Sequence, residues 1–352
     1  MADDILIITP DLSLNGANVA LMELMRLFAQ KKFNMWIMAS EDGGFRKQAE
    51  SMNARVIISP YVKSDVEKSV LKHEFRFVFL NSSSVHYYAL YFQNTQIPVY
   101  WWFHESFEQL NSSRDNFVHL SMLSSNFTFL AVTDKVARGL SDLYGVRPEI
   151  LPMPIAEPSY INDSKPGNDR ITFFMPASYT YIKGQDVLLK AVGRLPAEYI
   201  EKSEFILAGY KIPTQEQYYD IIRKMCALLG NVRMTDEIPR EEVYRIYGQC
   251  DCVIAPSRTD STPTTAAEGL MFGKICIVSD GTGISEYITD GTDGLVFKSE
   301  DADELSGIIM RIIDNFSGFK NIGTEGRKLY EKYFEPGTVL DRINKIFSIR
   351  KE

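Results

Sequence analysis

The sequence predicts an α/β protein made of two doubly wound domains, each with a parallel sheet between layers of helices. Short runs of β-branched and aromatic residues alternate with helical patterns along almost the whole chain. The alternation breaks once, in a proline-rich polar stretch at 152–169. The length of 352 residues is about twice that of an average domain, which agrees with two separate cores.

The first domain is predicted over residues 1–155. Its expected strands are DILIITP, NMWIMAS, ARVIISP, FRFVFLNSS, IPVYWWFHE, FTFLAVT and EILPMPI. The first helix, at about 18–30, has apolar residues at helical spacing, so its methionines are expected in the core. Residues 156–170 are predicted to be a linker because prolines and polar residues there oppose any regular element.

The second domain is predicted over residues 171–337. Its expected strands are ITFFMPAS, EFILAGY, VRMTDEI, CDCVIAPS, KICIVSD and GLVFK. The final segment, 338–352, follows Pro336 and Gly337 and has an apolar face that is expected to pack back on the first domain. Open α/β sheets bind ligands at the carboxyl ends of their strands, so we expect a binding cleft between the domains.

Composition excludes several function classes. The formal net charge of −8 argues against a broad nucleic-acid surface, which needs clustered Lys and Arg. The four cysteines form no C-x-x-C pair or metal-ligand pattern and are expected in the core. No apolar run approaches the roughly 18 residues of a transmembrane helix, and the acidic N-terminus is unlike a signal peptide, so a cytoplasmic location is expected.

The stretch SRTDSTPTTAAEGLMFGKICIVSDGTG, residues 257–283, predicts a short helix with a marked beginning. Thr262 suits the N-cap and Pro263 suits the first helical position. Backbone N–H groups near Thr264 and Thr265 would then lack helical partners. Such groups at a helix N-terminus attract anions, so this point suits a phosphate.

Two acids, Asp260 and Glu268, flank this helix start with seven residues between them. Carboxylates accept hydrogen bonds from hydroxyl groups. A phosphate site between two carboxylates would therefore match a nucleotide sugar, in which phosphate lies between two groups that carry hydroxyls. The spacing alone fits equally well an ordinary capped helix with two solvated acids. Both interpretations stay open at this point.

Three further residues are candidates for a binding site. Gly16 precedes the first helix and would let the backbone approach a ligand closely. His104, with Glu105, ends an aromatic strand, although a single histidine at such a place can also be structural. Lys183 stands just before a helix and offers a point charge for a phosphate, unless it is a solvated surface lysine.

Taken together, these positions resemble the family-4 retaining glycosyltransferases of the GT-B fold, most clearly over residues 171–297. The segments similar to that family's second domain, in order and spacing, are FFMPASYTYIKGQDVLLKA, FILAGY, DCVIAPSRTD and DSTPTTAAEGLMFGKICIVSDGTGISEYITDGTDGLVF. The resemblance implies two Rossmann-like domains that face each other across a cleft. The first would bind the acceptor and the second the nucleotide-sugar donor.

The resemblance also implies roles for the candidate residues. Glu268 would hold the ribose hydroxyls of the donor, Asp260 would contact the sugar hydroxyls, and the backbone at 263–265 would lie beside the diphosphate or sugar. Lys183 would neutralise the leaving diphosphate. In the first domain, Gly16 and His104 would lie near the diphosphate and the donor sugar, respectively.

The sequence departs from the family pattern in three places. Asp260 replaces the usual Glu and is one methylene shorter, which puts the identity of the donor sugar in question. Ser178 stands in the donor site where the family commonly has Arg, so Lys183 must carry more of the charge, or another base such as Arg258 must help. The first-domain loop has NGAN in place of paired glycines.

The expected activity is transfer of a sugar from a UDP-, GDP- or similar nucleotide sugar to a hydroxyl of a carbohydrate or lipid-linked acceptor, with retention and without a metal or other cofactor. A sugar-nucleotide epimerase of the same fold and a catalytically silent nucleotide-sugar-binding protein are the alternatives. The aromatic runs HYYALYF and YWWF are better explained by burial than by peripheral membrane contact, which the sequence nevertheless allows.

Overall fold

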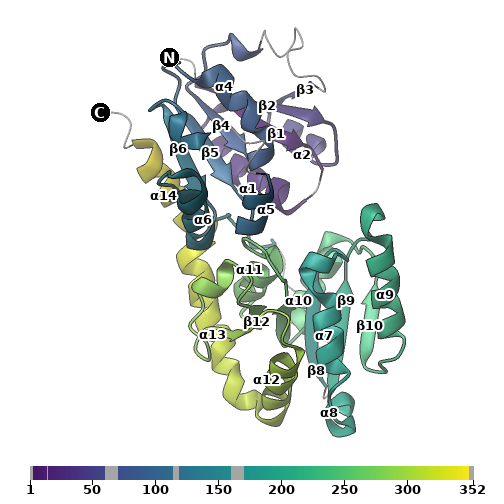
Figure 1. The fold of residues 1–352 in the computed structure, drawn as a ribbon. Coiled ribbons are helices and arrows are strands. Elements are labelled where there is room, and N and C mark those ends of the chain that lie inside the picture. Colours follow the sequence, from purple (N-terminus) through teal and green to yellow (C-terminus); the bar gives the residue numbers. More distant parts are fainter. Residues whose placement is uncertain (1–2, 14, 60–69, 114–118, 160–169, 349–352) are drawn as a thin grey trace. The chain divides into compact units, whose positions relative to one another are not determined.

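The computed structural model describes residues 3–13, 15–59, 70–113, 119–159 and 170–348 (Figure 1). The chain divides into two compact units. Unit 1 consists of Met1–Ala156 and Phe334–Glu352, and unit 2 consists of Glu157–Tyr333. Each unit has its own parallel sheet and its own hydrophobic core. Most of the predicted linker, 160–169, lies outside the described residues.

The sheet of unit 1 has seven parallel strands in the order β3-β2-β1-β4-β5-β6-β7. They are β1 (Asp4–Asp11), β2 (Asn34–Glu41), β3 (Arg55–Ile58), β4 (Phe77–Asn81), β5 (Val99–Phe103), β6 (Phe127–Ala131) and β7 (Glu149–Ile150). Each strand falls on a predicted run. The last strand is short because the prolines that follow it cannot donate to a sheet. The YWWF run is fully buried in β5, as expected.

Within the described part of unit 1, the helices are α1 (Gly16–Gln30), α2 (Arg46–Ser51), α4 (Ala89–Phe92), α5 (Phe107–Ser112), α6 (Asp134–Tyr144) and α14 (Pro336–Ser348), with 3₁₀ helices η1 (Ser83–Tyr88) and η3 (Leu120–Met122). Helix α1 begins at Gly16, two residues earlier than predicted, because the Asn15 side chain accepts a hydrogen bond from the Asn18 N–H (2.9 Å) and caps it. Helix α14 begins at Pro336 rather than after Gly337, and its Phe347 ring stacks on Phe77 of β4.

The sheet of unit 2 has six parallel strands in the order β10-β9-β8-β11-β12-β13. They are β8 (Ile171–Pro176), β9 (Ser203–Ala208), β10 (Val232–Thr235), β11 (Cys252–Ala255), β12 (Ile275–Ser279) and β13 (Leu295–Phe297), all on predicted runs. In order of sequence this is the Rossmann arrangement 3-2-1-4-5-6. The strand order reverses between β8 and β11, which makes their carboxyl ends the expected ligand-binding edge.

The helices of unit 2 are α7 (Gln185–Val192), α8 (Ala197–Glu201), α9 (Glu216–Cys226), α10 (Arg240–Gln249), α11 (Thr264–Met271), α12 (Ala302–Asp314) and α13 (Phe316–Tyr333). The 3₁₀ helices are η4 (Tyr181–Lys183), η5 (Pro213–Gln215) and η6 (Ile284–Glu286). Helix α7 packs against α9 and α12, whereas α11 packs against α13, so helices form two layers around the sheet (Figure 1). All four cysteines are buried, as predicted.

Candidate functional site

The loops that follow β8 and β11 lie in direct contact at the reversal point of the unit 2 sheet. Gly184, with φ +75°, ends η4, and a Cβ placed on it would lie 2.1 Å from the Pro256 carbonyl oxygen. Only glycine fits both the left-handed conformation and this close approach. The Arg258 N–H then donates to the Ile182 carbonyl oxygen at 2.8 Å. The two loops therefore form one surface at the binding edge.

Lys183 and Asp260 meet across these two loops. The Lys183 ammonium lies 2.5 Å from Asp260 Oδ2, and the two side chains are 31% and 13% exposed. Backbone bonds also hold Asp260, whose carbonyl oxygen accepts from the Gly283 N–H (2.8 Å). Lys183 is therefore not the freely solvated lysine that the sequence also allowed. Its ammonium has three donors, so it can bind an anion while it stays paired with Asp260.

Helix α11 begins one residue later than predicted. Pro263 has an extended ψ of 113° and is the N-cap, so Thr264 is the first helical residue and Thr262 is not the cap. The Thr262 hydroxyl is buried, and among the described residues it has no hydrogen-bond partner. The first helical bonds run from the Ala266 and Ala267 N–H groups to the Pro263 carbonyl. The N–H groups of Thr264 and Thr265 precede these bonds and are not needed by the helix.

Glu268 lies on the buried face of α11, and its side chain is 4% exposed. It forms an ion pair with Arg240 at the start of α10, whose guanidinium also lies 4.5 Å from the centroid of the Tyr244 ring. Together with the low exposure of Asp260, this burial contradicts the alternative of two solvated acids. A buried carboxylate needs a partner, and Arg240 supplies it. Sequence reasoning missed Arg240, because it lies 28 positions before Glu268 and no local pattern links the two.

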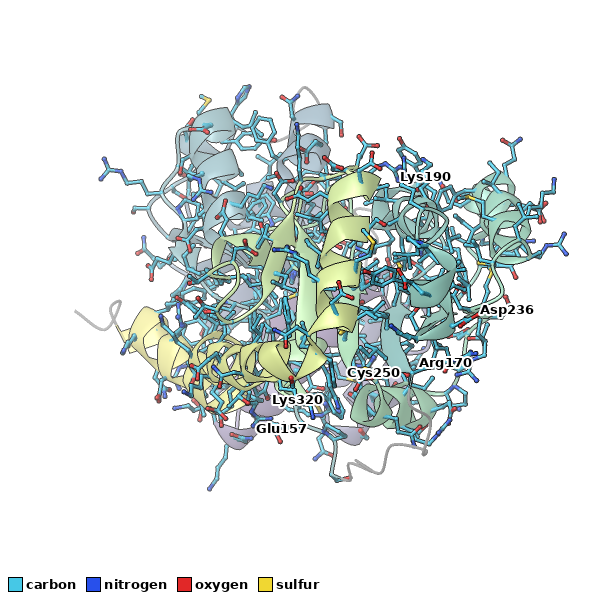
Figure 2. All side chains as sticks on the ribbon, turned by 90° about the horizontal axis from the view of Figure 1, so that it is seen from below. Glu157, Arg170, Lys190, Asp236, Cys250 and Lys320 are labelled. Atoms are coloured by element: carbon cyan, nitrogen blue, oxygen red, sulfur yellow. The ribbon has the colours of Figure 1, made fainter. Side chains whose placement is uncertain are left out.

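Arg258 is not available as a free second cation, contrary to the suggestion made from the sequence. Its two terminal nitrogens each lie 2.9 Å from an oxygen of Asp186, and its Nε lies 2.7 Å from Glu300 Oε1. Burial by itself would raise the pKa of Asp186, but hydrogen bonds from Arg258 and Lys190 hold it well below its ordinary value. Lys190 is labelled in Figure 2. The Ser178 carbonyl oxygen accepts from Gln185 (2.8 Å).

In unit 1, His104 follows the carboxyl end of β5 and lies 2.9 Å from Asn81 at the end of β4. Because Asn81 presents its carbonyl oxygen, the His104 Nε2 carries the proton and donates. Burial lowers the pKa of His104 to about 3, so the ring is neutral at ordinary pH. Its Nδ1 is a buried acceptor with no protein partner in the part of the chain that the structure describes.

Other polar groups in unit 1 surround this histidine. Asn81 donates to Thr9 of β1 (3.1 Å), and the Thr9 hydroxyl donates to the buried Asn18 (2.9 Å). Sequence reasoning missed Asn18, although it stands in the NGAN loop. Gly16 is the first residue of α1, and a Cβ there would meet open space, which agrees with an approach route for a ligand but does not require glycine.

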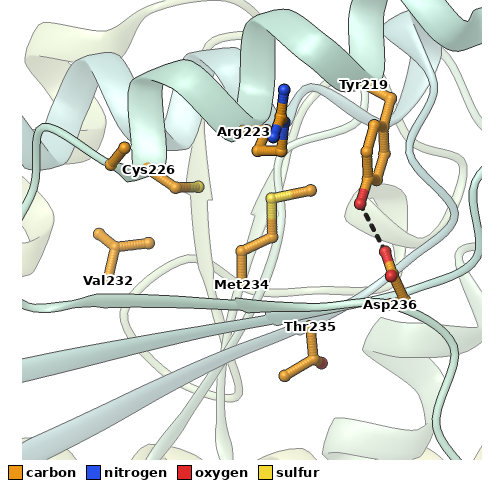
Figure 3. A pocket seen from close by; sticks show the side chains of 8 residues that line it. Tyr219, Arg223, Cys226, Val232, Met234, Thr235 and Asp236 are labelled. Carbon is orange, nitrogen blue, oxygen red and sulfur yellow. Dashed lines mark hydrogen bonds between the residues drawn. The ribbon is translucent and has the colours of Figure 1, made fainter.

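A separate pocket lies at the outer edge of unit 2, between α9 and β10 (Figure 3). Its lining includes Tyr219, Arg223, Met234 and Asp236, and the Tyr219 hydroxyl lies 2.5 Å from Asp236. It contains none of the residues singled out from the sequence. The described residues contain no group of three metal-ligating side chains and no helix with both the length and the apolarity to cross a membrane.

Two Rossmann-like units in one chain define the class of this protein, the GT-B glycosyltransferase fold. The fold is shared with the Anabaena protein Alr3699/HepE crystallised with UDP-glucose, which superposes with a TM-score of 0.82 at 15% identity over 98% of this chain and 99% of that one. Residues 157–329 match the model of the family Glycosyl transferases group 1. These residues fill unit 2 almost entirely.

Curated relatives align over shorter segments. An uncharacterized glycosyltransferase of Methanocaldococcus jannaschii is 25% identical over 105 residues, 30% of each chain. The N,N'-diacetylbacillosaminyl-diphospho-undecaprenol alpha-1,3-N-acetylgalactosaminyltransferase of Campylobacter jejuni is 30% identical over 76 residues, 22% of this chain and 20% of that protein. The chain thus spans less than a third of the length of these two relatives.

Proposed function

We propose that the protein is a retaining glycosyltransferase that moves a sugar from a nucleotide diphosphate sugar to a hydroxyl of a carbohydrate or glycoconjugate acceptor. The observation that carries this proposal is the Lys183–Asp260 pair in the loops that precede α7 and α11, at the reversal point of a sheet within the segment that matches the group 1 family model. One cation, two spare N–H groups and two low-exposure carboxylates match a diphosphate between two hydroxyl-bearing groups.

Stabilisation of the leaving diphosphate is the main catalytic requirement of this reaction. Negative charge develops on the diphosphate as the bond to the sugar breaks, and the Lys183 ammonium and the N–H groups of Thr264 and Thr265 are already in place to stabilise it. Asp260 would hold the sugar hydroxyls and Glu268 the ribose. The neutral His104 would accept a hydrogen bond from a donor hydroxyl through Nδ1.

The donor is expected to be a UDP- or GDP-sugar, and the UDP-glucose bound by the Anabaena protein supports the former. The acceptor class includes lipid-linked sugars, since the name of the Campylobacter relative includes such a group. We propose that no dedicated carboxylate base and no metal takes part, and that the leaving phosphate accepts the proton of the acceptor. Turnover should then survive an excess of EDTA.

A thermal-shift screen against UDP, GDP, dTDP and ADP sugars tests donor binding, because a ligand that binds the folded state raises its melting temperature. NMR of freshly formed product then tests retention, and the opposite anomer would refute it. Conversion of the donor sugar into its epimer in buffer without acceptor would indicate an epimerase. Binding of the donor without turnover on any acceptor would indicate a silent binding protein.

A further inference from the structure

Arg258 lies where the loops after β8 and β11 join, and its side chain is 11% exposed. It makes four side-chain hydrogen bonds: two to Asp186 (2.9 Å each), one to Glu300 (2.7 Å) and one to the Tyr181 carbonyl oxygen (2.6 Å). Its guanidinium also lies 3.8 Å from the centroid of the Tyr181 ring. One side chain thus joins its own loop to two segments that are distant in the sequence, residues 181–186 and the loop at Glu300.

We propose that Arg258 is a positioning residue that holds Lys183 opposite Asp260 through its bonds to Asp186 and Tyr181, without binding the diphosphate itself. This inference rests on the function proposed above. Tyr181 opens the single turn of η4 that ends at Lys183, so fixing Tyr181 fixes the origin of the lysine side chain. Asp260 follows Arg258 by two residues on the opposite loop.

The low exposure of the Arg258–Asp186 pair explains why Arg258 does not leave to follow a substrate. The two side chains are 11% and 10% exposed, and Asp186 also accepts from Tyr218 (2.9 Å) and Lys190 (2.8 Å). Departure of the guanidinium would break two charge-assisted hydrogen bonds at a carboxylate that water reaches poorly, and Lys190 alone would remain as its cation among the described contacts. The bidentate fork and the stacking on Tyr181 are geometries that Arg provides and Lys does not.

The rival interpretation is that Arg258 replaces the arginine absent at Ser178 and binds the diphosphate directly. The two interpretations predict opposite signs for Asp186→Asn. If Arg258 positions Lys183, loss of the Asp186 charge loosens the η4 turn and weakens diphosphate binding. If Arg258 binds phosphate, the same substitution frees its charge and strengthens binding.

The experiment uses the full chain and whichever of UDP, GDP, dTDP and ADP the wild-type protein binds, with the matching monophosphate as a second probe. Calorimetric titration should show that Arg258→Met and Asp186→Asn each weaken diphosphate binding about tenfold and change monophosphate binding less than twofold. The double variant should lose little more than either single variant. Arg258→Lys should fall between wild type and Arg258→Met.

Arg245→Met is the matched control, because Arg245 pairs only with Glu242 and Gln249 of its own helix among the described contacts, and it should bind like wild type. If Arg258→Met fails to fold, Tyr218→Phe removes one donor to Asp186 and should weaken diphosphate binding about twofold. Tighter binding by Asp186→Asn, or equal losses for diphosphate and monophosphate, would overturn the inference. A wild-type protein that binds none of UDP, GDP, dTDP and ADP would instead overturn the proposed function.

Discussion

The proposed donor site has a ribose end at Glu268 and a sugar end at Asp260, so substitutions at these acids should have different effects. Glu268→Gln keeps the volume of a side chain that is 4% exposed but removes its charge. Hydrogen bonds to a charged group contribute about 1.5 to 3 kcal/mol, which corresponds to a loss of roughly 10- to 160-fold in affinity. Free nucleotide should therefore bind Glu268→Gln much more weakly.

Asp260→Asn should behave in the opposite way toward free nucleotide. Asp260 lies 2.5 Å from the Lys183 ammonium and so shares it with any bound diphosphate. The amide that Asp260→Asn introduces carries no charge, so the Lys183 ammonium can interact with the diphosphate alone. Affinity for UDP or GDP should stay the same or rise a few-fold, because an ion pair between partly exposed side chains contributes about 1 kcal/mol at most. Turnover should still drop by about tenfold or more, because the carboxylate that accepts hydrogen bonds from the sugar hydroxyls is lost.

Calorimetric titration with free nucleotide and initial rates with the intact donor separate these effects. Glu242→Gln is the control for Glu268→Gln, because Glu242 is a partly exposed acid paired with Arg245 in α10. It should bind and turn over like wild type. Our division of the site is wrong if Asp260→Asn loses as much nucleotide affinity as Glu268→Gln, or if Glu268→Gln binds the nucleotide normally.

Three further predictions concern the rest of the site. Lys183→Met should lower kcat by about 100-fold, which is the scale for removing one group that stabilises developing charge. Lys211 is an exposed lysine paired with Glu216, and Lys211→Met should leave kcat unchanged. Equal kcat values for the two variants would refute the role of Lys183. The folded-state pKa of His104, about 3, lies below its unfolded value near 6.5, so the unfolded state binds the extra proton and stability falls as pH drops through this window. Wild type should lose about 2 kcal/mol more than His104→Gln between pH 7 and pH 5 in urea unfolding, and parallel curves would contradict the neutral ring. Gly184→Ala should cost at least about 2 kcal/mol, more than Gly291→Ala, which has the same φ of +75° but open space around it.

The sequence alone determined the strands and the class of the fold. Each strand is a short run whose β-branched and aromatic side chains favour extended backbone, and this signal is local. The sequence also located the α11 start and its flanking acids, because capping residues and Pro act on their immediate neighbours. It misplaced the cap by one residue, since Pro263 fixes its own φ but leaves ψ to the surrounding structure, which sets it at 113°.

Tertiary structure decided the charge partners. Lys183 and Asp260 are 77 positions apart, and Arg258 and Asp186 are 72 apart, so only the adjacency of β8 and β11 in the sheet brings each pair together. From the sequence, Lys183 was the candidate for the diphosphate and Arg258 was a base that could help it. Burial separates them: Arg258 is enclosed by the groups that it binds, whereas the Lys183 side chain stays 31% exposed. Which cation can reach a ligand depends on packing, and packing between distant segments leaves no periodic trace in the sequence.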